Sequence, residues 1–303
     1  MIGFNGGRVG KANPTLAGLS IPGVWTLREQ EVAVRTATWA GTDLLDLYPG
    51  AASAYSLRVL RQAYSNSPVV EVRRSSGSPS TATFTALEVI DNTLADWVGA
   101  GNNGFVRTWY DQSGNANDAQ QTTDANQPQI IASGALILNN GRPVIRFDGT
   151  TDGLVQTVNA TISQPFTAIM VGKRNADVAG RNQDLFRSTS GQTVNFFNTS
   201  DSGNLYGFAG AVVKLGDTAI DTRFLSSVVY NGASSTNFFN NSQTTINLGS
   251  DALNTSNVLN IANGTALNTW AAVDMPELIF YASSQAGNFT GINSNINAFY
   301  GIY

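Results

Sequence analysis

The residues best suited to contact a ligand lie in one short segment, Trp109-Tyr110-Asp111-Gln112-Ser113-Gly114-Asn115. An aromatic ring offers apolar area beside a polar edge, and the carboxylate and amide groups that follow can form hydrogen bonds. We therefore take Trp109, Tyr110, Asp111 and Asn115 as candidate ligand-binding residues. Because adjacent residues of a strand point to opposite sides, we expect one of the two aromatic rings to face the core.

The same segment places oxygen atoms at alternating positions from Asp111 to Asp118, as part of a calcium loop would. Ala116 stands at the sixth position, where a helix-loop-helix calcium loop has Gly, and Thr122 stands at the twelfth, where it has Glu. The alternative is a turn in which Asp111 and Asn115 bond local backbone groups and Gly114 takes a positive φ. We predict the turn, and neither a metal nor a cofactor.

Composition excludes several chemistries. The chain has neither Cys nor His, which removes thiol nucleophiles, thiolate metal sites, the commonest general base and the commonest zinc ligand. Charged residues make up 13 % of the chain, against roughly 25 % in an average soluble protein, and 31 Asn, 29 Thr and 26 Ser take their place. With a net charge of −4 there is no basic field for nucleic acid, and no apolar run is long enough to span a membrane or form a signal peptide.

The chain around these candidate residues divides into two parts. Residues 1–42, rich in Gly and broken by Pro14 and Pro22, are expected to form an irregular arm. Its Phe4, Trp25 and Trp39 predict docking, either on its own domain or on a partner. Residues 43–303 form one domain. We expect a helix after Ser53, with Leu57, Leu60 and Tyr64 on one face, and a second helix capped by Asp91.

Beyond Gly104, short apolar runs bounded by Gly, Asn and Asp are typical of a β sandwich. We therefore predict an all-β jelly-roll sandwich with a short helical insert and an extended N-terminal arm. The expected strands are 105–110, 143–147, 166–173, 193–197, 224–230, 237–239, 258–261 and 276–281.

Three blocks, Ala54-Tyr55-Ser56-Leu57-Arg58, Val72-Arg73-Arg74-Ser75-Ser76 and Trp109 to Asn115, resemble the catalytic domain of the α-L-arabinofuranosidase B family. Arg146-Phe147-Asp148-Gly149-Thr150-Thr151-Asp152 and the closing segments 276–281 and 298–302 look like the first and last strands of concanavalin A-like, laminin-G-type jelly rolls. The resemblance covers about residues 43 to 303. It implies a two-sheet sandwich that presents a groove or loop face to carbohydrate.

The carboxylates that this family uses for hydrolysis have no clear counterparts here. Its nucleophile is a Glu in a Met-Glu-Asn-Asn type segment, and its acid is an Asp in a Gly-Gly-Asp-Asn type turn. The approximate counterparts are Tyr206-Gly207-Phe208-Ala209-Gly210-Ala211, without a carboxylate, and Ile261-Ala262-Asn263-Gly264, with Asn where Asp is required. An amide cannot protonate a leaving oxygen, so we expect no catalysis.

Other acids do not change this expectation. We interpret Glu277 as a solvated or edge-strand residue. The pairs Asp217 with Asp221 and Asp274 with Glu277 remain open, because sequence spacing cannot show whether they converge.

The arm shows a second resemblance. Gly3-Phe4-Asn5-Gly6-Gly7, Gly23-Val24-Trp25-Thr26-Leu27-Arg28-Glu29 and Arg35-Thr36-Ala37-Thr38-Trp39 are similar to the opening of structural proteins of tailed bacteriophages, especially cyanophages. This implies a virion component, as a fibre, spike or baseplate appendage and less readily a capsid decoration. We expect partners among other virion proteins, a homo-oligomer and a host-surface glycan. The alternatives are an active α-L-arabinofuranosidase or related glycosidase, and a secreted carbohydrate-binding module.

Overall fold

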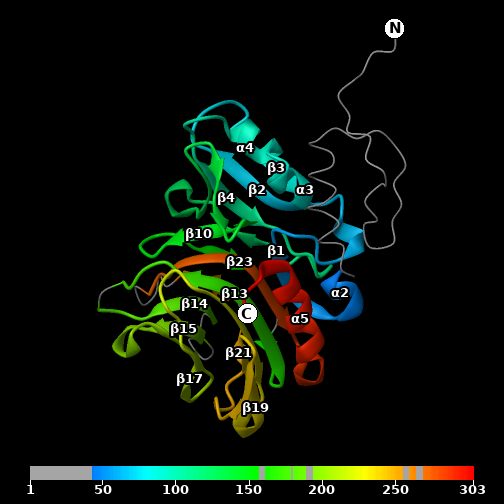
Figure 1. The fold of residues 1–303 in the computed structure, drawn as a ribbon, viewed down its shortest axis with the longest axis vertical. Coiled ribbons are helices and arrows are strands. Elements are labelled where there is room, and N and C mark those ends of the chain that lie inside the picture. The colour runs from blue at the N-terminus through cyan, green and yellow to red at the C-terminus, as the bar shows by residue number, and fades with distance from the viewer. Residues whose placement is uncertain (1–42, 157–160, 179, 189–193, 255–258, 264–268) are drawn as a thin grey trace, which may run out of the picture.

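A computed structural model describes residues 43–156, 161–178, 180–188, 194–254, 259–263 and 269–303 (Figure 1). The predicted arm at 1–42, with Phe4, Trp25 and Trp39, lies outside the described residues. Its boundary and its docking role therefore stay predictions. Within the described ranges, no helix is both long enough and apolar enough to cross a membrane.

In the part of the chain that the structure describes, nineteen strands share one antiparallel hydrogen-bonded network, which bends into two layers. Across the first layer the order is β3 (Thr81–Thr85), β2 (Pro68–Arg74), β4 (Gly104–Trp109), β6 (Gln129–Ala132), β10 (Ile145–Asp148), β23 (Ala272–Tyr281), β13 (Phe166–Arg174), β18 (Arg223–Tyr230), β19 (Ser235–Phe239) and β20 (Ser242–Ile246). β1 (Ala51–Ser56) follows β10 along the same edge of β23, and β7 (Ala135–Leu136) pairs with β6.

The second layer branches from β4. Phe105 of β4 pairs with Gln129 of β6, whereas Trp109 pairs with Ala119 of β5, so one strand serves both layers. The order is then β5 (Ala119–Gln120), β11 (Leu154–Gln156), β22 (Leu259–Ile261), β14 (Gln183–Ser188), β15 (Val194–Asn198), β16 (Asn204–Phe208) and β17 (Val212–Gly216). Two short ribbons are formed by β8 (Leu138–Asn139) with β9 (Arg142–Pro143), and by β12 (Thr161–Ile162) with β21 (Leu253–Asn254).

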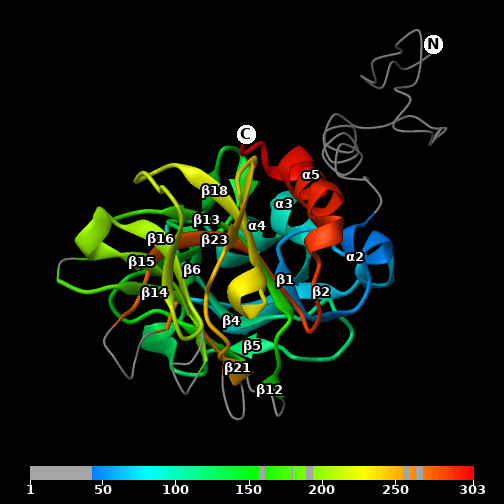
Figure 2. The ribbon, with the colours of Figure 1, turned by 90° about the horizontal axis from the view of Figure 1, so that it is seen from below.

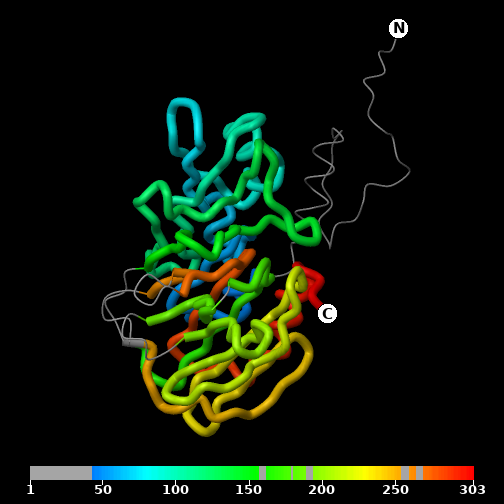
Figure 3. Tube along the Cα trace, turned by 90° about the vertical axis from the view of Figure 1, so that its left-hand side faces the viewer, coloured from blue at the N-terminus to red at the C-terminus, as the bar shows by residue number. Residues whose placement is uncertain are grey.

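The two layers enclose the main hydrophobic core (Figures 2 and 3). Phe186 of β14 meets Phe280 of β23 edge to face, with 5.0 Å between ring centroids, and Phe197 meets Phe224 in the same way at 5.9 Å. At the far edge, Asn237 Nδ2 donates a hydrogen bond to the Leu215 carbonyl at 2.8 Å. Burial of this apolar area is the main force that holds the layers together.

The α-helices of the described residues are α2 (Leu44–Leu47), α3 (Ala86–Ile90), α4 (Thr93–Val98) and α5 (Phe289–Tyr300). Thr85 and Glu88 form a capping box at the start of α3. The α5 helix lies on the outer face of β13 and β23, where Ile292 and Ile296 pack into a second apolar cluster with Ile169 and Ile279 (Figure 1). Single 3₁₀ turns occur at Gln62–Tyr64, Asp124–Asn126, Thr199–Asp201, Gly232–Ser234 and Ala286–Asn288.

The predicted all-β sandwich with a short helical insert is confirmed, and so is the helix after Asp91, which is α4. Two element predictions are wrong. The segment after Ser53 continues strand β1, because its backbone pairs with β23 from Ala51 to Ser56. The closing segment 298–302 is the end of α5 and its tail, because the apolar residues from Phe289 onward recur at helical spacing over a sheet face.

Candidate functional site

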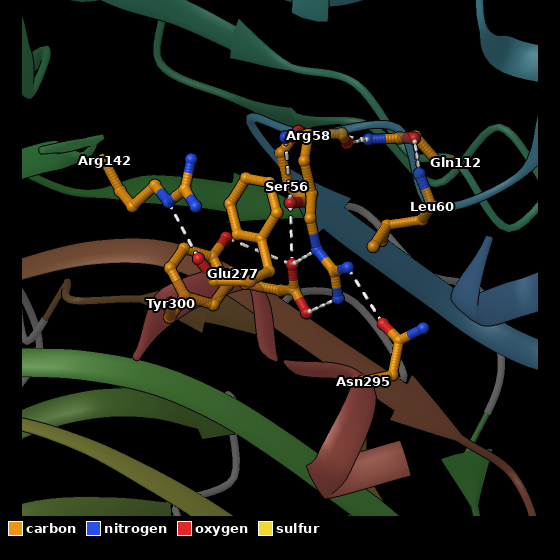
Figure 4. Close-up of polar contacts among 9 residues, drawn as sticks. Ser56, Arg58, Leu60, Gln112, Arg142, Glu277, Asn295 and Tyr300 are labelled. Carbon is orange, nitrogen blue, oxygen red and sulfur yellow. Dashed lines mark hydrogen bonds and ion pairs between the residues drawn. The ribbon is translucent and has the colours of Figure 1, made fainter. Parts of the chain in front are cut away.

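Glu277 lies at the centre of a buried polar cluster (Figure 4). Its side chain is fully buried and accepts hydrogen bonds from Arg58 Nε at 2.8 Å and Nη2 at 3.0 Å, from Ser56 Oγ at 2.8 Å and from the Tyr300 hydroxyl at 3.1 Å. The interpretation of Glu277 as a solvated or edge-strand residue is wrong, because β23 is flanked there by β1 and β13.

This cluster fastens α5 to the sheet. Arg58 Nη1 donates to Asn295 Oδ1 at 2.9 Å, and the guanidinium carbon lies 4.9 Å from the centre of the Phe299 ring. Burial opposes the charge on Arg58, but the Glu277 carboxylate outweighs it and raises the pKa of Arg58. Burial and the same carboxylate also raise the pKa of Tyr300. We therefore assign Glu277 a structural role.

The Asp111 segment forms the predicted turn. Asp111 Oδ1 accepts from the backbone N–H groups of Ala54 and Ser113, both at 2.8 Å, and Oδ2 accepts from the N–H of Asn117 at 3.0 Å. Gly114 has a φ of +99°, and Asn115 Nδ2 donates to the carbonyls of Ala51 and Ala52. Among the described residues, no group of three or more Asp, Glu, His or Cys side chains could hold a metal.

Of the neighbouring aromatic residues Trp109 and Tyr110, one was expected to face the core, and that residue is Trp109. It is fully buried, with its ring centroid 5.5 Å from that of Tyr55. The prediction that Trp109 contacts a ligand is therefore wrong for this fold, because no part of its ring reaches the surface. Tyr110 is half-buried, and for it ligand contact stays a prediction.

A second group of side chains crosses the outer face of the first layer in a straight row. In an antiparallel sheet, directly paired residues project to the same face. The pairs Arg73–Phe105, Phe105–Gln129, Gln129–Arg146, Arg146–Asp274 and Asp274–Lys173 therefore place six side chains side by side from β2 to β13. We call these the transverse row: Arg73, Phe105, Gln129, Arg146, Asp274 and Lys173.

Five side chains of the transverse row, all except the fully buried Asp274, line a groove with two hollows. One hollow, of about 500 Å³, is lined on its floor by Arg73, Phe105 and Gln129. The other, of about 370 Å³, is lined by Gln129, Arg146 and Lys173. Gln129, Asp148 and Asp152 line both, so the turn that carries the two aspartates stands where the hollows meet.

Every cation of the row has a carboxylate partner. Arg146 Nε and Nη2 donate to the fully buried Asp274 at 2.8 and 2.9 Å, and Lys173 Nζ lies 2.8 Å from Asp221 Oδ1 and 3.5 Å from Asp274 Oδ2. Arg73 Nε lies 3.3 Å from Asp124 Oδ1, and its guanidinium carbon lies 4.7 Å from the centre of the Phe105 ring. The Asp274 hydrogen bonds are the main cause of the raised pKa of Arg146.

The backbone N–H of Asp148 and that of Asp152 each donate to the side-chain carboxylate of the other residue, and the two carboxyls have very different pKa values. The Asp152 N–H donates to Asp148 Oδ1 at 3.0 Å, and the Asp148 N–H donates to Asp152 Oδ2 at 3.1 Å. Burial, reinforced by the Asp148 charge, raises the pKa of Asp152 to about 7. Burial acts in the same direction on Asp148, but donors from Thr150, Thr151 and Asp152 outweigh it and lower its pKa to about 2.

The expected counterparts of the family's catalytic residues lie in the second layer. Segment 206–211 begins in β16, where the Tyr206 hydroxyl donates to Asp201 Oδ2 at 2.9 Å. Asn263 follows β22 and is buried, whereas Gly264 lies outside the described residues. Of the open acid pairs, Asp274 and Glu277 both lie on β23 but have separate cationic partners, Arg146 and Arg58. Asp217 lies 2.6 Å from Lys214 Nζ.

The transverse row could not be predicted from the sequence. The alternation of polar and apolar residues that marks an exposed face is present, since Val72, Val106, Ile145 and Val273 beside the row are buried. What the sequence lacks is the register between strands that are far apart in the chain, and only that register places the six side chains in line.

Comparisons with known proteins bear on the fold. No family model matches this chain, and no curated protein matches it. Among solved structures, a glutamate-to-glutamine mutant of a GH54 α-L-arabinofuranosidase soaked with 4-nitrophenyl α-L-arabinofuranoside matches with a TM-score of 0.62 at 16 % identity, over 85 % of this chain and 64 % of that chain. An arabinofuranosidase complexed with arabinofuranosyl-α-1,2-xylobiose matches with a TM-score of 0.58 at 17 % identity, over the same shares.

A Trypanosoma rangeli sialidase in complex with sialic acid matches more weakly, with a TM-score of 0.42 at 11 % identity, over 64 % of this chain and 31 % of that chain. The chain thus spans 64 % of the length of the arabinofuranosidases that it resembles. At these identities the likeness shows the fold alone. The chain has the concanavalin A-like β-sandwich fold and resembles a glycoside hydrolase catalytic domain.

Proposed function

We propose that the sandwich of residues 43–303 binds a carbohydrate along the transverse row and does not cleave it. The observation that carries this proposal is the row itself, a floor of guanidinium, amide and aromatic side chains set in one line by strand register. At about 4.8 Å between strands, the six side chains span about 24 Å, which suits an extended ligand. The likeness to carbohydrate-active folds supports the same ligand class.

The row offers the contacts that sugars use. Phe105 is half-buried, and ring area of this kind packs against the C–H face of a sugar. Gln129 and Arg146 supply amide and guanidinium groups for hydroxyls. Because each cation already has a carboxylate partner, we expect a neutral sugar to fit better than an anionic one.

Hydrolysis requires two carboxylates that flank the scissile bond, about 5 to 5.5 Å apart for retention and about 6.5 to 9.5 Å apart for inversion. Asp274 is held by Arg146, and Asp148 is engaged by the donors of its own turn. Asp152 comes from that same turn and so approaches a ligand from the same side as Asp148. This arrangement supports binding without cleavage.

A glycan array probed with the full chain tests the binding proposal. Phe105→Ala removes the aromatic floor, and Val212→Ala, at an exposed position on β17, is the matched control. We expect neutral glycans to be retained by the wild type and by Val212→Ala, with retention of at least one extended glycan lost in Phe105→Ala. Equal retention by all three proteins would contradict the proposed site.

For the whole chain, the proposed setting is a virion of a tailed bacteriophage, with the sandwich presented outward and residues 1–42 as the docking arm. The sequence of the arm supports this part. Immunogold electron microscopy with an antibody against residues 43–303 tests it: label at the tail or its fibres supports an appendage, and unlabelled particles contradict it. Trp25→Ala with Trp39→Ala should reduce incorporation while the sandwich stays folded.

An active α-L-arabinofuranosidase is the second candidate, favoured by the likeness to arabinofuranosidases over 85 % of the chain. A chromogenic arabinofuranoside separates the two candidates. If the chain turns over this substrate and a single substitution, such as Asp152→Asn, abolishes the turnover, the arabinofuranosidase replaces the binding proposal.

A further inference from the structure

A third pocket, of about 620 Å³, lies where β1 and β13 begin and β23 ends. Its polar wall consists of Asn115, Asn117, Ser163, Gln164, Ser283 and Ser284. Asp274 in the transverse row and Tyr281, which directly precedes this pocket, are seven residues apart on β23, or about 23 Å at 3.3 Å per residue. The pocket is therefore separate from the groove.

Local hydrogen bonds fix the two asparagines of this wall. Asn117 Nδ2 donates to the Ala52 carbonyl at 2.8 Å, and Asn115 Nδ2 donates to the carbonyls of Ala51 and Ala52, both at 3.0 Å. The amide nitrogens are thus turned toward the β1 backbone. No described residue donates to either amide oxygen, so both oxygens remain available as acceptors.

The serines of this wall can donate hydrogen bonds, whereas the asparagine oxygens accept them. Ser283 Oγ accepts from Gln285 Nε2 at 3.0 Å, and Ser284 Oγ accepts from the N–H of Ala286 at 3.4 Å. A hydroxyl that accepts one bond keeps its own proton to donate. A sugar or polyol hydroxyl both donates and accepts, so this wall matches it on both counts.

The rest of the lining is small and apolar: Ala52, Ile162, Pro165 and Ala282. Of the described residues that line the pocket, none carries a charge. We propose that this pocket is a second binding site, for an uncharged, hydroxyl-rich ligand such as a neutral saccharide. Because this pocket shares no residue with the groove, ligand binding at the two sites can be tested independently.

Protein-detected NMR on the full chain tests the pocket, with L-arabinose, D-xylose and D-galactose as probes up to about 100 mM, far above a millimolar Kd. We expect the backbone amide signals of Asn117, Ser283 and Ser284 to shift and saturate with at least one sugar. Signals that do not move with any of the three sugars would overturn the proposal.

Two variants fill the pocket, Ala282→Trp and Ser163→Trp, both at exposed positions. Ala135→Trp, exposed on β7, is the matched control. Either filling variant that keeps a dispersed spectrum, and is therefore folded, should bind the sugar at least tenfold more weakly in the chemical-shift titration. The control should bind it with the affinity of the wild type. Undiminished shifts in a folded filling variant would contradict the site. Phe105→Ala should leave the pocket unaffected, which separates this proposal from the groove.

Discussion

Asp274 and Arg146 face each other across the β10–β23 ladder, and two hydrogen bonds of 2.8 and 2.9 Å join the fully buried carboxylate to the half-exposed guanidinium. Asn175 Nδ2 adds a third bond to Asp274 Oδ1 at 2.7 Å. A buried acid is thus used to hold a surface cation in a fixed orientation. The groove depends on this orientation, because Arg146 lies in the middle of the transverse row.

Arg146→Met should destabilise the protein at about pH 7, because Asp274 would lose its two strongest donors inside the sheet. We expect a loss of about 1 to 3 kcal/mol in urea unfolding. The matched control is Arg107→Met, whose partly exposed pair with Glu71 should contribute about 1 kcal/mol or less. Equal losses in the two variants would contradict the anchoring role of Asp274.

Glu277→Gln should be more costly, because it leaves the buried Arg58 guanidinium without its anionic partner. Breaking a buried ion pair on one side costs about 3 to 5 kcal/mol, and replacing both partners by apolar residues costs much less. Urea unfolding of Glu277→Gln and of the double variant Arg58→Met with Glu277→Leu measures this difference. A single variant as stable as the wild type would show that the cluster does not hold α5.

Asp152→Asn should change how stability depends on pH. The folded protein holds the Asp152 proton up to about pH 7, whereas the unfolded chain releases it near pH 3.8, so this residue lowers stability as the pH rises between these values. At about pH 8 the variant should be more stable by about 1 to 3 kcal/mol, less than three full pKa units would give, because the carboxyl is partly solvated.

At about pH 3.5 the Asp152→Asn variant and the wild type should have nearly equal stability, because the wild-type carboxyl is protonated in the folded state and mostly protonated in the unfolded state. Asp148 acts in the opposite sense: its lowered pKa adds stability that is lost as the pH falls from about 4 to about 2. Chemical unfolding at the two pH values checks the prediction. A stability difference that is independent of pH would refute the raised pKa of Asp152.

Ile296→Ala should loosen α5, because Ile296 is fully buried between the helix and the outer face of β13 and β23. Truncation of such a residue costs about 2 to 5 kcal/mol. Thr290→Ala, at an exposed position of the same helix, should stay within about 0.5 kcal/mol of the wild type. Similar effects at both positions in thermal unfolding would show that α5 gains nothing from this face.

The strands with strong β-branched or aromatic runs could be predicted from the sequence. Val69, Val70 and Val72 are in β2, and the runs at 166–173 and 224–230 are β13 and β18. Such side chains fit a pleated, buried surface, so their local preference agrees with their place in the fold. The Asp111 turn could be predicted as well, because its bonds join residues close in sequence.

The errors have one physical cause, which is contact between distant segments. The helix predicted after Ser53 gives way to β1 because β23, more than 200 residues later, provides a ladder for its backbone. The buried environment of Glu277 and the alignment of the transverse row depend on the same long-range pairing. The α5 helix could have been predicted from the sequence, because Phe289, Ile292, Ile296 and Phe299 recur at helical spacing.

Carbohydrate binding along the transverse row is tested by an equilibrium titration of the full chain with a neutral oligosaccharide retained on the array, followed by mass spectrometry of the recovered ligand. We predict saturable binding by a chain whose second pocket is filled by Ala282→Trp, loss of that binding when Phe105→Ala is added but not when Val212→Ala is added, and recovery of the intact oligosaccharide. Binding that survives Phe105→Ala in the chain with the filled pocket, or a cleaved ligand, would contradict carbohydrate binding along the transverse row without cleavage.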